Sequence, residues 1–266
     1  MAALAAALLS SCAHAPPLEG RIWDTHAARF VSPEALYQRA SRARHVILGE
    51  THDNAEQHRL QRVVLDALAG TPRVLAMEQF DSEHQAAIDA ARPAGVEALA
   101  DAGRFDRKGW NWPLYRPLVE FALEHGWPIA AANLSRGEAR AVVADPARSG
   151  LPPAPPAVQA ALERDIVEGH CGKPPDPRRL AGMVEAQRAR DARMAAVIRG
   201  RRSVLIAGNG HARPDRGVPL YLGDGDVVSI AFTEVEPGRR SPRDYEAGSY
   251  DYLWFTPRAA REDPCK

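Results

Sequence analysis

The sequence predicts an α/β fold with a mixed, mostly parallel central sheet, flanked by helices and carrying a helical insertion. Three observations support this fold class. Several short apolar runs lack polar alternation, as expected for strands that are buried on both faces of a parallel sheet. Helical periodicity fills most of the gaps between these runs. The two patterns alternate along the chain, which is typical of α/β proteins.

The expected strands are short and apolar. Four of them are rich in Val, Ile, Leu and Ala, at residues 45–49, 74–77, 128–132 and 203–207. Two later apolar runs cover residues 218–222 and 227–232. A Gly-Asp-Gly-Asp segment separates these two runs, which predicts that they pair as a β-hairpin.

Apolar residues at helical spacing predict helices between the strands. One such stripe covers residues 54–69 and ends at a Gly-Thr-Pro segment, and another ends at Gly126. A third helix is expected over residues 178–199, where Gln187 and Asp191 interrupt the apolar face. These two polar side chains either bond to buried backbone groups or reach a polar site at the edge of the sheet.

The chain is expected to form a single domain over residues 21–258, followed by a C-terminal tail at 259–266. The helical insertion lies at about 145–199. Its two proline-rich stretches, 145–156 and 169–177, predict an extended linker or surface loops.

The charge and hydropathy of the chain exclude two classes of protein. Lys and Arg total 34 and Asp and Glu total 34, so there is no excess of positive charge for nucleic acid. No apolar run approaches the roughly 20 residues of a spanning helix, which excludes a polytopic membrane protein.

The N-terminus predicts lipid anchoring. Residues 1–11 are mostly Ala and Leu followed by Ser, and Cys12 comes next, as at the end of a bacterial lipoprotein signal peptide. Cys12 is then the lipidated first residue, and residues 12–20 form a tether to the cell envelope, expected on the periplasmic side of the outer membrane. No basic residue precedes Arg21, and an upstream start codon would supply one. The alternative is a disordered Ala-rich N-terminus.

An exported chain meets an oxidising compartment. The remaining cysteines, Cys171 and Cys265, then either form a bridge that holds the C-terminal tail or stay unpaired.

Polar residues follow each of the four apolar strands. Glu50 and His52 follow the first, Glu78 and Gln79 follow the second, Asn133 follows the third, and His211 follows the fourth. Ligands of open α/β sheets bind past the carboxyl ends of the strands, so these side chains predict a shared site. Both histidines stand in a Gly-x-x-His spacing, where glycine permits a tight turn and a close backbone approach.

Two further side chains could contact a cofactor. Tyr115 lies in an aromatic segment, where a phenolate could ligate ferric haem, although core packing is the simpler interpretation. His170 is an imidazole in an expected loop. There is no Cys-x-x-Cys-His motif, so any haem would be held non-covalently.

Several segments together resemble the ChaN family of haem-binding lipoproteins. They include residues 46–61, 111–116, 131–134, 187–194 and 208–213. The resemblance implies an α/β protein that takes part in haem or iron acquisition and dimerises around haem. The resemblance also implies that a tyrosine ligates the haem iron, and Tyr115 is the best match. It implies that basic side chains bind the haem propionates, for which His170 and Arg213 are candidates. His211 is a further candidate for contact with the haem.

The two Gly-x-x-His spacings and Glu78 resemble a different branch of that superfamily, the Tiki/TraB-like proteins. This second resemblance implies a metal-dependent hydrolase or protease, in which a divalent metal is bound by His52 and His211 with Glu50 or Glu78. A third interpretation is a structural lipoprotein, in which these polar side chains form only a hydrogen-bonded network.

Overall fold

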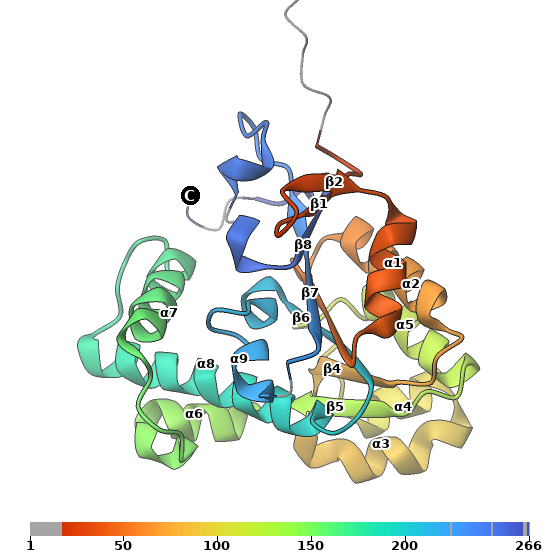
Figure 1. The fold of residues 1–266 in the computed structure, drawn as a ribbon. Helices are drawn as coiled ribbons and strands as arrows, with labels where there is room; N and C mark the ends of the chain where they lie inside the picture. The colour runs from red at the N-terminus through yellow and green to blue at the C-terminus, as the bar shows by residue number, and fades with distance from the viewer. Residues whose placement is uncertain (1–17, 224, 246, 263–264, 266) are drawn as a thin grey trace, which may run out of the picture.

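The structure is a computed structural model that describes residues 18–223, 225–245, 247–262 and 265. These residues form an eight-stranded sheet with helices on both faces, which confirms the predicted α/β class (Figure 1). The predicted signal peptide, Cys12 and most of the tether lie outside the described residues.

The sheet has the strand order β2-β1-β8-β7-β3-β6-β4-β5. Its pairs from β8 to β5 are parallel, while β1 pairs antiparallel with both β8 and β2. The strands are β1 Ile22–Asp24, β2 Arg29–Val31, β3 His45–Glu50, β4 Val74–Asp81, β5 Ile129–Asn133, β6 Ser203–Gly208, β7 Val227–Glu234 and β8 Tyr252–Thr256.

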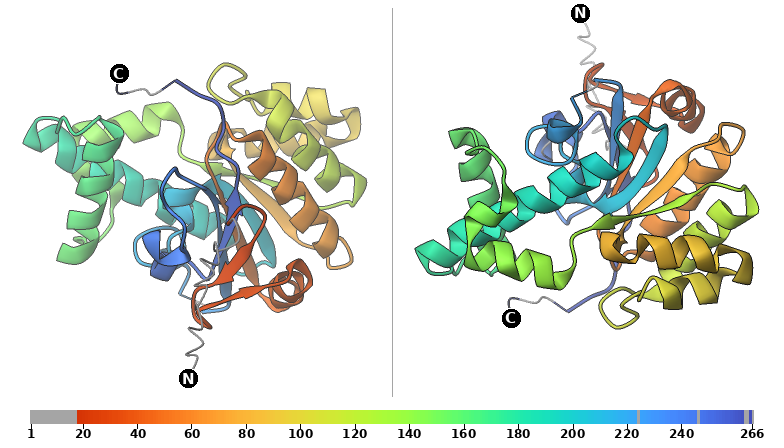
Figure 2. Two further views of the ribbon diagram at one scale, coloured as in Figure 1. Left: turned by 90° about the horizontal axis from the view of Figure 1, so that it is seen from above. Right: turned by 90° about the horizontal axis from the view of Figure 1, so that it is seen from below.

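Helices cover the two faces of the sheet unequally. The larger core lies under α1, α2, α4 and α5, and the smaller one lies under the C-terminal half of α8 together with α9. The helices are α1 Pro33–Arg42, α2 Ala55–Leu68, α3 Gln85–Ala91, α4 Val96–Ala102, α5 Trp112–Glu124, α6 Arg136–Ala144, α7 Pro156–Gly169, α8 Pro177–Ile198 and α9 Pro219–Leu222. Figure 2 shows α6, α7 and the start of α8 projecting beyond the sheet.

Local sequence signals explain where the helices at the site begin. Asn54 caps α2, because its side chain accepts a hydrogen bond from the backbone of Gln57. Asp176 caps α8 in the same way, and Pro177 occupies the first helical position. Among the described residues, no helix is both long enough and apolar enough to cross a membrane.

The predicted hairpin is wrong. Residues 219–222 form the short helix α9, which Pro219 begins and the left-handed Gly223 ends. Strand β7 instead pairs in parallel with β3, through residues 227–231. The Gly-Asp-Gly-Asp segment is consistent with a hairpin turn, but its first glycine, Gly223, ends a helix.

Two further differences concern the end of one expected strand and three strands that were not expected. Strand β4 continues to Asp81, with an irregularity after Met77, so Glu78 lies within the strand and not after it. The short strands β1, β2 and β8, which form one side of the sheet, were not predicted, because three to five residues carry little periodicity.

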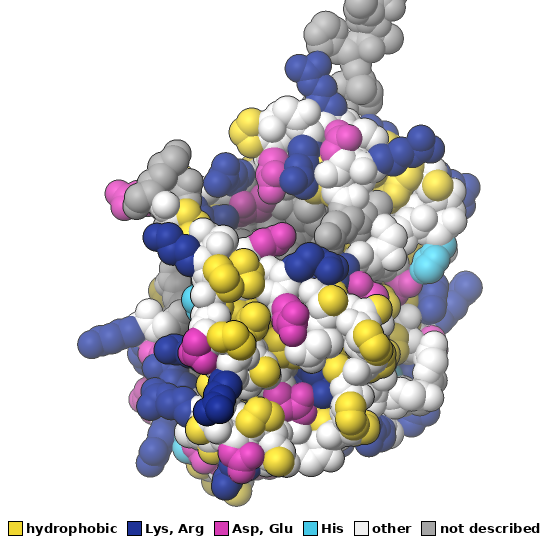
Figure 3. Space-filling view, turned by 90° about the vertical axis from the view of Figure 1, so that its left-hand side faces the viewer, with side chains coloured by type: hydrophobic (Ala, Val, Ile, Leu, Met, Phe, Trp, Pro, Cys, Tyr) yellow, Lys and Arg dark blue, Asp and Glu magenta, His cyan; other side chains and the backbone are white. Residues whose placement is uncertain are grey.

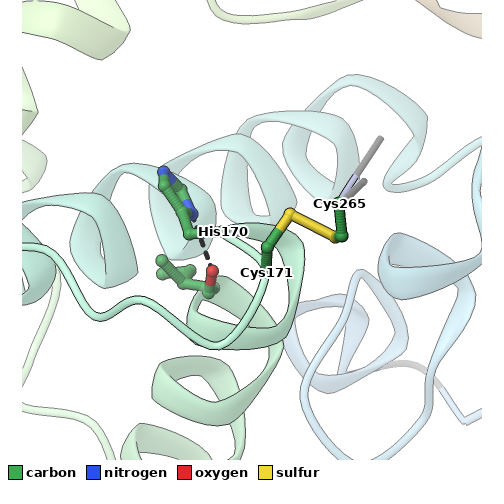
Figure 4. Close-up of a disulfide and its surroundings, with 4 residues drawn as sticks. His170, Cys171 and Cys265 are labelled. Carbon is green, nitrogen blue, oxygen red and sulfur yellow. Dashed lines mark hydrogen bonds between the residues drawn. A yellow bond between two sulfur atoms is a disulfide. The ribbon is translucent and has the colours of Figure 1, made fainter. Parts of the chain in front are cut away.

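A disulfide attaches Cys265 to the helical arm, the part of the molecule formed by α6, α7 and the start of α8. Cys171 and Cys265 form a disulfide across a sequence separation of 94, with Cα atoms 5.4 Å apart (Figure 4). The described Cys265 therefore lies beside the turn between α7 and α8. These two cysteines were expected either to form a bridge or to stay unpaired, and the structure contains the bridge.

Candidate functional site

The parallel strands bring the expected polar residues to one edge of the sheet. Glu50, the last residue of β3, pairs with Gly208, the last residue of β6. Glu78 lies on β4, one residue beyond the end of its pairing with β6, and its Oε2 accepts a hydrogen bond from the Gly208 backbone at 2.8 Å. His52 and His211 follow β3 and β6 closely, so both imidazoles reach the same place.

Glu50 is the centre of a buried network. Its side chain is 0% exposed, and its carboxylate lies within hydrogen-bond distance of four side chains: His52 (2.9 Å), Gln61 (2.8 Å), Gln79 (3.2 Å) and Tyr115 (2.5 Å). Burial alone would raise the pKa of Glu50, but the charges of His58 and His52 and these hydrogen bonds lower it. Glu50 is therefore a buried carboxylate that its surroundings keep ionised.

His211 is held between two carboxylates. Its Nδ1 lies 2.6 Å from Asp191 Oδ1, and its Nε2 lies 3.4 Å from Glu78 Oε1. Burial alone would lower the pKa of His211, but the charges of Glu78 and Asp191 raise it to about 10. His211 is consequently a cation at neutral pH.

The two carboxylates beside His211 differ from each other. Burial would raise the pKa of Glu78, but the charge of His211 outweighs burial and lowers this pKa to about 2. Burial is the dominant influence on Asp191 and raises its pKa to about 6. Glu78 is thus the firmly ionised partner of the imidazolium.

Glycines allow these groups to approach so closely. A Cβ atom on Gly208 would lie 2.9 Å from His52 Cε1, and one on Gly49 would lie 2.5 Å from Asn209 Oδ1 and 3.2 Å from Asn209 Cα. Real Cβ atoms do not approach other atoms below about 3 Å, so a side chain at either position would displace its neighbours. The two glycines of the Gly-x-x-His spacings therefore serve close packing.

Two clefts border the network. The first, called here the His52 cleft, has a volume of about 430 Å³. It is lined by His52, Glu78, Gln79, Asp81, Arg104, Asp106, Gly109, Trp110, Asn133, Leu134, Arg136, Gln187, Arg190 and His211.

The second cleft, called here the α7 cleft, has a volume of about 350 Å³ and lies between α7, α8 and the loop after β6. It is lined by Leu162, Asp165, Ile166, Gln187, Asp191, Gly210, Arg213, Arg216 and Tyr250. Gln187 lines both clefts and has its Nε2 3.1 Å from His211 Nε2. Of the alternatives for Gln187 and Asp191, both side chains reach the polar site.

The expected iron ligand Tyr115 does not face a surface. Its side chain is 0% exposed and packs among His58, Phe105 and Trp110. Its hydroxyl donates to Glu50, and burial together with the charge of Glu50 raises the pKa of this phenol far above its usual range. A neutral phenol inside the core cannot meet a haem iron without unpacking α5, so we assign Tyr115 to the Glu50 network.

The other two haem candidates lie near the helical arm. His170 is exposed at the end of α7, where its Nδ1 lies 2.7 Å from the Ile166 carbonyl oxygen (Figure 4). Arg213 is buried at the wall of the α7 cleft, where it pairs with Asp215. His211 belongs to the buried network.

The four expected metal ligands form hydrogen bonds or ion pairs with one another and with other protein groups. Within the described part of the chain, ligand atoms close enough to share an ion belong to Asp81, Glu83 and His84, and not to Glu50, His52, Glu78 and His211. The imidazoles of His52 and His211 already bond to carboxylates.

Sequence reasoning missed two polar members of the network, His58 and Gln61, and had placed the third, Gln79, at a strand end. His58, Gln61 and Gln79 are buried and contact Glu50. Gln61 precedes Val64 by three residues on the apolar face of α2, so its position was a signal: a polar residue at a core position needs a buried partner.

The chain is an α/β protein with a buried polar network and two clefts at the carboxyl edge of a mostly parallel sheet, which is where open α/β sheets bind ligands. Residues 36–222 match the family described as haem-binding uptake, Tiki superfamily, ChaN. This match covers more than half of the sequence, so the chain belongs to that family, and the resemblance noted in the sequence is confirmed.

Several solved structures are similar to this chain. ChaN of Campylobacter jejuni, in a structure of its cofacial haem binding, is 25% identical with a TM-score of 0.75, over 88% of this chain and 95% of that chain. The type III effector HopBA1 is 15% identical with a TM-score of 0.49, over 92% and 99%. RRSP, a MARTX toxin effector domain from Vibrio vulnificus, is 18% identical with a TM-score of 0.44, over 78% and 36%. No curated protein matched the chain.

Proposed function

We propose that this protein binds haem and takes part in haem or iron acquisition as a lipid-anchored protein of the bacterial cell envelope. The observation that carries the proposal is membership of a haem-binding uptake family. The similar protein from C. jejuni binds haem cofacially.

The α7 cleft suits haem better than the His52 cleft. Leu162, Ile166 and the ring of Tyr250 offer apolar contact, and Arg213 and Arg216 offer cations. A haem needs both kinds of contact, because it has a large apolar surface and two carboxylates. Figure 3 shows this side of the molecule, where hydrophobic side chains reach the surface among Lys, Arg, Asp and Glu.

His170 is the donor that we propose for the iron. Its Nδ1 lies 2.7 Å from the Ile166 carbonyl, and Ile166 itself lines the α7 cleft. Histidines that ligate metals usually donate their other ring N–H to a carbonyl or carboxylate, which leaves Nε2 as the ligand. The adjacent disulfide at Cys171 restrains the turn that carries this imidazole.

The size of the α7 cleft supports a homodimer around haem. Its volume of about 350 Å³ is near the lower end of the range for ligand sites, which is about 300–1,000 Å³. One copy therefore covers only part of a haem, and a second copy would cover the rest. The cofacial haems of the C. jejuni protein support the same arrangement.

A hemin titration tests the function. We expect a shifted Soret band at one hemin per chain, together with a larger sedimentation coefficient. His170→Ala should shift the Soret band again and weaken binding, because the iron loses its proposed ligand. Arg213→Gln should weaken binding by roughly tenfold without moving the band, because only a propionate partner is lost.

His26→Ala is the matched control, since His26 is also an exposed histidine but lies on the β1–β2 turn. A wild-type spectrum equal to that of free hemin would refute haem binding. An unchanged spectrum in His170→Ala would refute only the assigned ligand. Cell fractionation of the full chain against Cys12→Ser tests the lipid anchor, which rests on the sequence.

A further inference from the structure

Two buried arginines at the wall of the α7 cleft are paired with carboxylates. Arg213 donates two hydrogen bonds of 2.9 Å to Asp215, and Arg216 donates two, of 2.7 and 2.8 Å, to Asp165. A further hydrogen bond of 2.9 Å joins Arg216 to Asp215. Both arginine side chains are 8% exposed, so each is a desolvated cation in a charge-assisted, bidentate pair.

The four side chains carry balanced charges. Two guanidinium cations face the carboxylates of Asp165 and Asp215. A haem adds two propionates to this group. The Nε–Nη2 edge of each guanidinium is occupied by a protein carboxylate. A propionate can therefore form a bidentate pair at that edge only by displacing the carboxylate.

Asp165 is the carboxylate that a ligand can displace. Asp215 contacts both Arg213 and Arg216 and lies within two residues of each on one loop, so it cannot move away without a change in that loop. Asp165 instead lies on α7, 51 residues before Arg216 in the sequence. It can separate from Arg216 by a movement of α7, while the loop keeps its structure.

Helix α7 is part of the helical arm and packs outside the main cores. Its Leu162 joins Val184 of α8 in a small cluster that is separate from the two cores on the sheet. Figure 2 shows α7 beside the start of α8, away from the sheet. Two residues beyond the end of α7, Cys171 is bridged to Cys265. This bridge would limit how far α7 moves when its ion pair opens.

We propose that the Asp165–Arg216 ion pair is a latch on α7, and that a ligand carboxylate opens it by taking the place of Asp165 on Arg216. The inference rests on the proposed haem binding in the α7 cleft. Leu162 and Ile166 line this cleft and lie on α7, so the released helix widens the cleft for the ligand. The exchange replaces one ion pair with another, and the buried guanidinium is never left without a partner. The latch thereby selects ligands that carry a carboxylate.

Hydrogen exchange without hemin tests the latch by itself. Full-length Asp165→Asn should exchange the amides of α7 faster than the wild type, because the ion pair to Arg216 is lost. The matched control is Glu163→Gln, which removes the same charge from the same helix, where Glu163 accepts a hydrogen bond from Gln159. This control should exchange like the wild type, and circular dichroism checks that each variant is folded.

Hemin titration tests the exchange of carboxylates. The Kd of Asp165→Asn should be about tenfold lower than that of the wild type, because hemin no longer has to displace a charge-assisted pair. Glu163→Gln should bind hemin like the wild type. Arg216→Gln also removes the latch, so its α7 should exchange faster. Its Kd should not fall, because the propionate partner is lost with the latch.

The dimethyl ester of hemin tests the need for a carboxylate, since both of its propionates are blocked. The wild type should bind hemin at least about tenfold more tightly than the dimethyl ester. Arg216→Gln should narrow this difference, because one of the cations that recognise a propionate is gone.

Two results would overturn the proposal. In the first, the amides of α7 exchange equally fast in Asp165→Asn and Glu163→Gln. In the second, these two variants bind hemin with the same Kd. Equal Kd values for hemin and its dimethyl ester would overturn the selection of a carboxylate. If hemin binds neither the wild type nor Asp165→Asn, the proposed function fails, whereas the exchange measurement still decides whether the ion pair holds α7.

Discussion

Tyr115→Phe separates the two roles that Tyr115 could have, in haem ligation or in the Glu50 network. The phenol hydroxyl donates to the buried Glu50 carboxylate at 2.5 Å, and the ring is fully buried. The substitution keeps the ring and removes only this donor. Glu50 retains hydrogen bonds to the side chains of His52, Gln61 and Gln79.

The expected loss of stability follows from this geometry. A hydrogen bond to a charged group contributes about 1.5–3 kcal/mol. We expect the free energy of unfolding to fall by that amount, which lowers Tm by roughly 3–12 °C in a chain of this length. Urea unfolding followed by circular dichroism measures the change. The Soret band of the hemin complex should stay unchanged, because Tyr115 does not reach a surface.

The control is Tyr245→Phe, whose hydroxyl lies at an exposed site and accepts only a backbone N–H. That variant should lose less than about 0.5 kcal/mol. The reasoning fails if Tyr115→Phe changes the Soret band while stability stays within this margin. Such a result would mean that the phenol leaves Glu50 and ligates iron.

Three further predictions concern stability. The stabilisation that ionised Glu78 contributes should be lost as pH falls from 4.5 towards 2, and that from protonated His211 should be lost as pH rises from 6.5 towards 10. The midpoint of urea unfolding, measured across this pH range, reports both losses. In Glu78→Gln this midpoint should change less between pH 4.5 and pH 2 than in the wild type. Cys265→Ser should lower the free energy of unfolding by about 2–4 kcal/mol in non-reducing buffer, because the bridge closes a long loop. Gly208→Ala should cost about 1–3 kcal/mol through contact with the His52 ring, whereas Gly210→Ala, with open space around its Cα, should cost less; equal losses would contradict the packing argument.

Local patterns were sufficient for four of the parallel strands and for the edge of the sheet at which Glu50 and Glu78 lie. Apolar runs identified β3, β4, β5 and β6, because a strand buried on both faces has little choice of composition. The rule that ligands bind past the carboxyl ends of parallel strands then indicated where Glu50 and Glu78 would meet. The structure has these two residues at that edge.

Local patterns failed where distant packing decides between two structures. Residues 218–222 have strand-like composition, but residues 219–222 form the helix α9. Pro219 suits the first helical turn, and β7, the expected hairpin partner, pairs with β3 instead. The expected helical insertion contains α8, whose C-terminal half carries Met194 and Ile198 into the core against the sheet.

By itself, the sequence determined the α/β class, four parallel strands and the polar residues at their carboxyl ends, because local composition and spacing control burial and turns. Only the tertiary structure decided that Tyr115 bonds to Glu50, that His211 lies between two carboxylates, and that separate clefts flank them. These features depend on side chains that are 20 to 133 residues apart in the chain, as with Asp191 and His211 or Glu78 and His211. Charge and burial at such contacts are set by which strands and helices pack together, and no local pattern of residues records that choice.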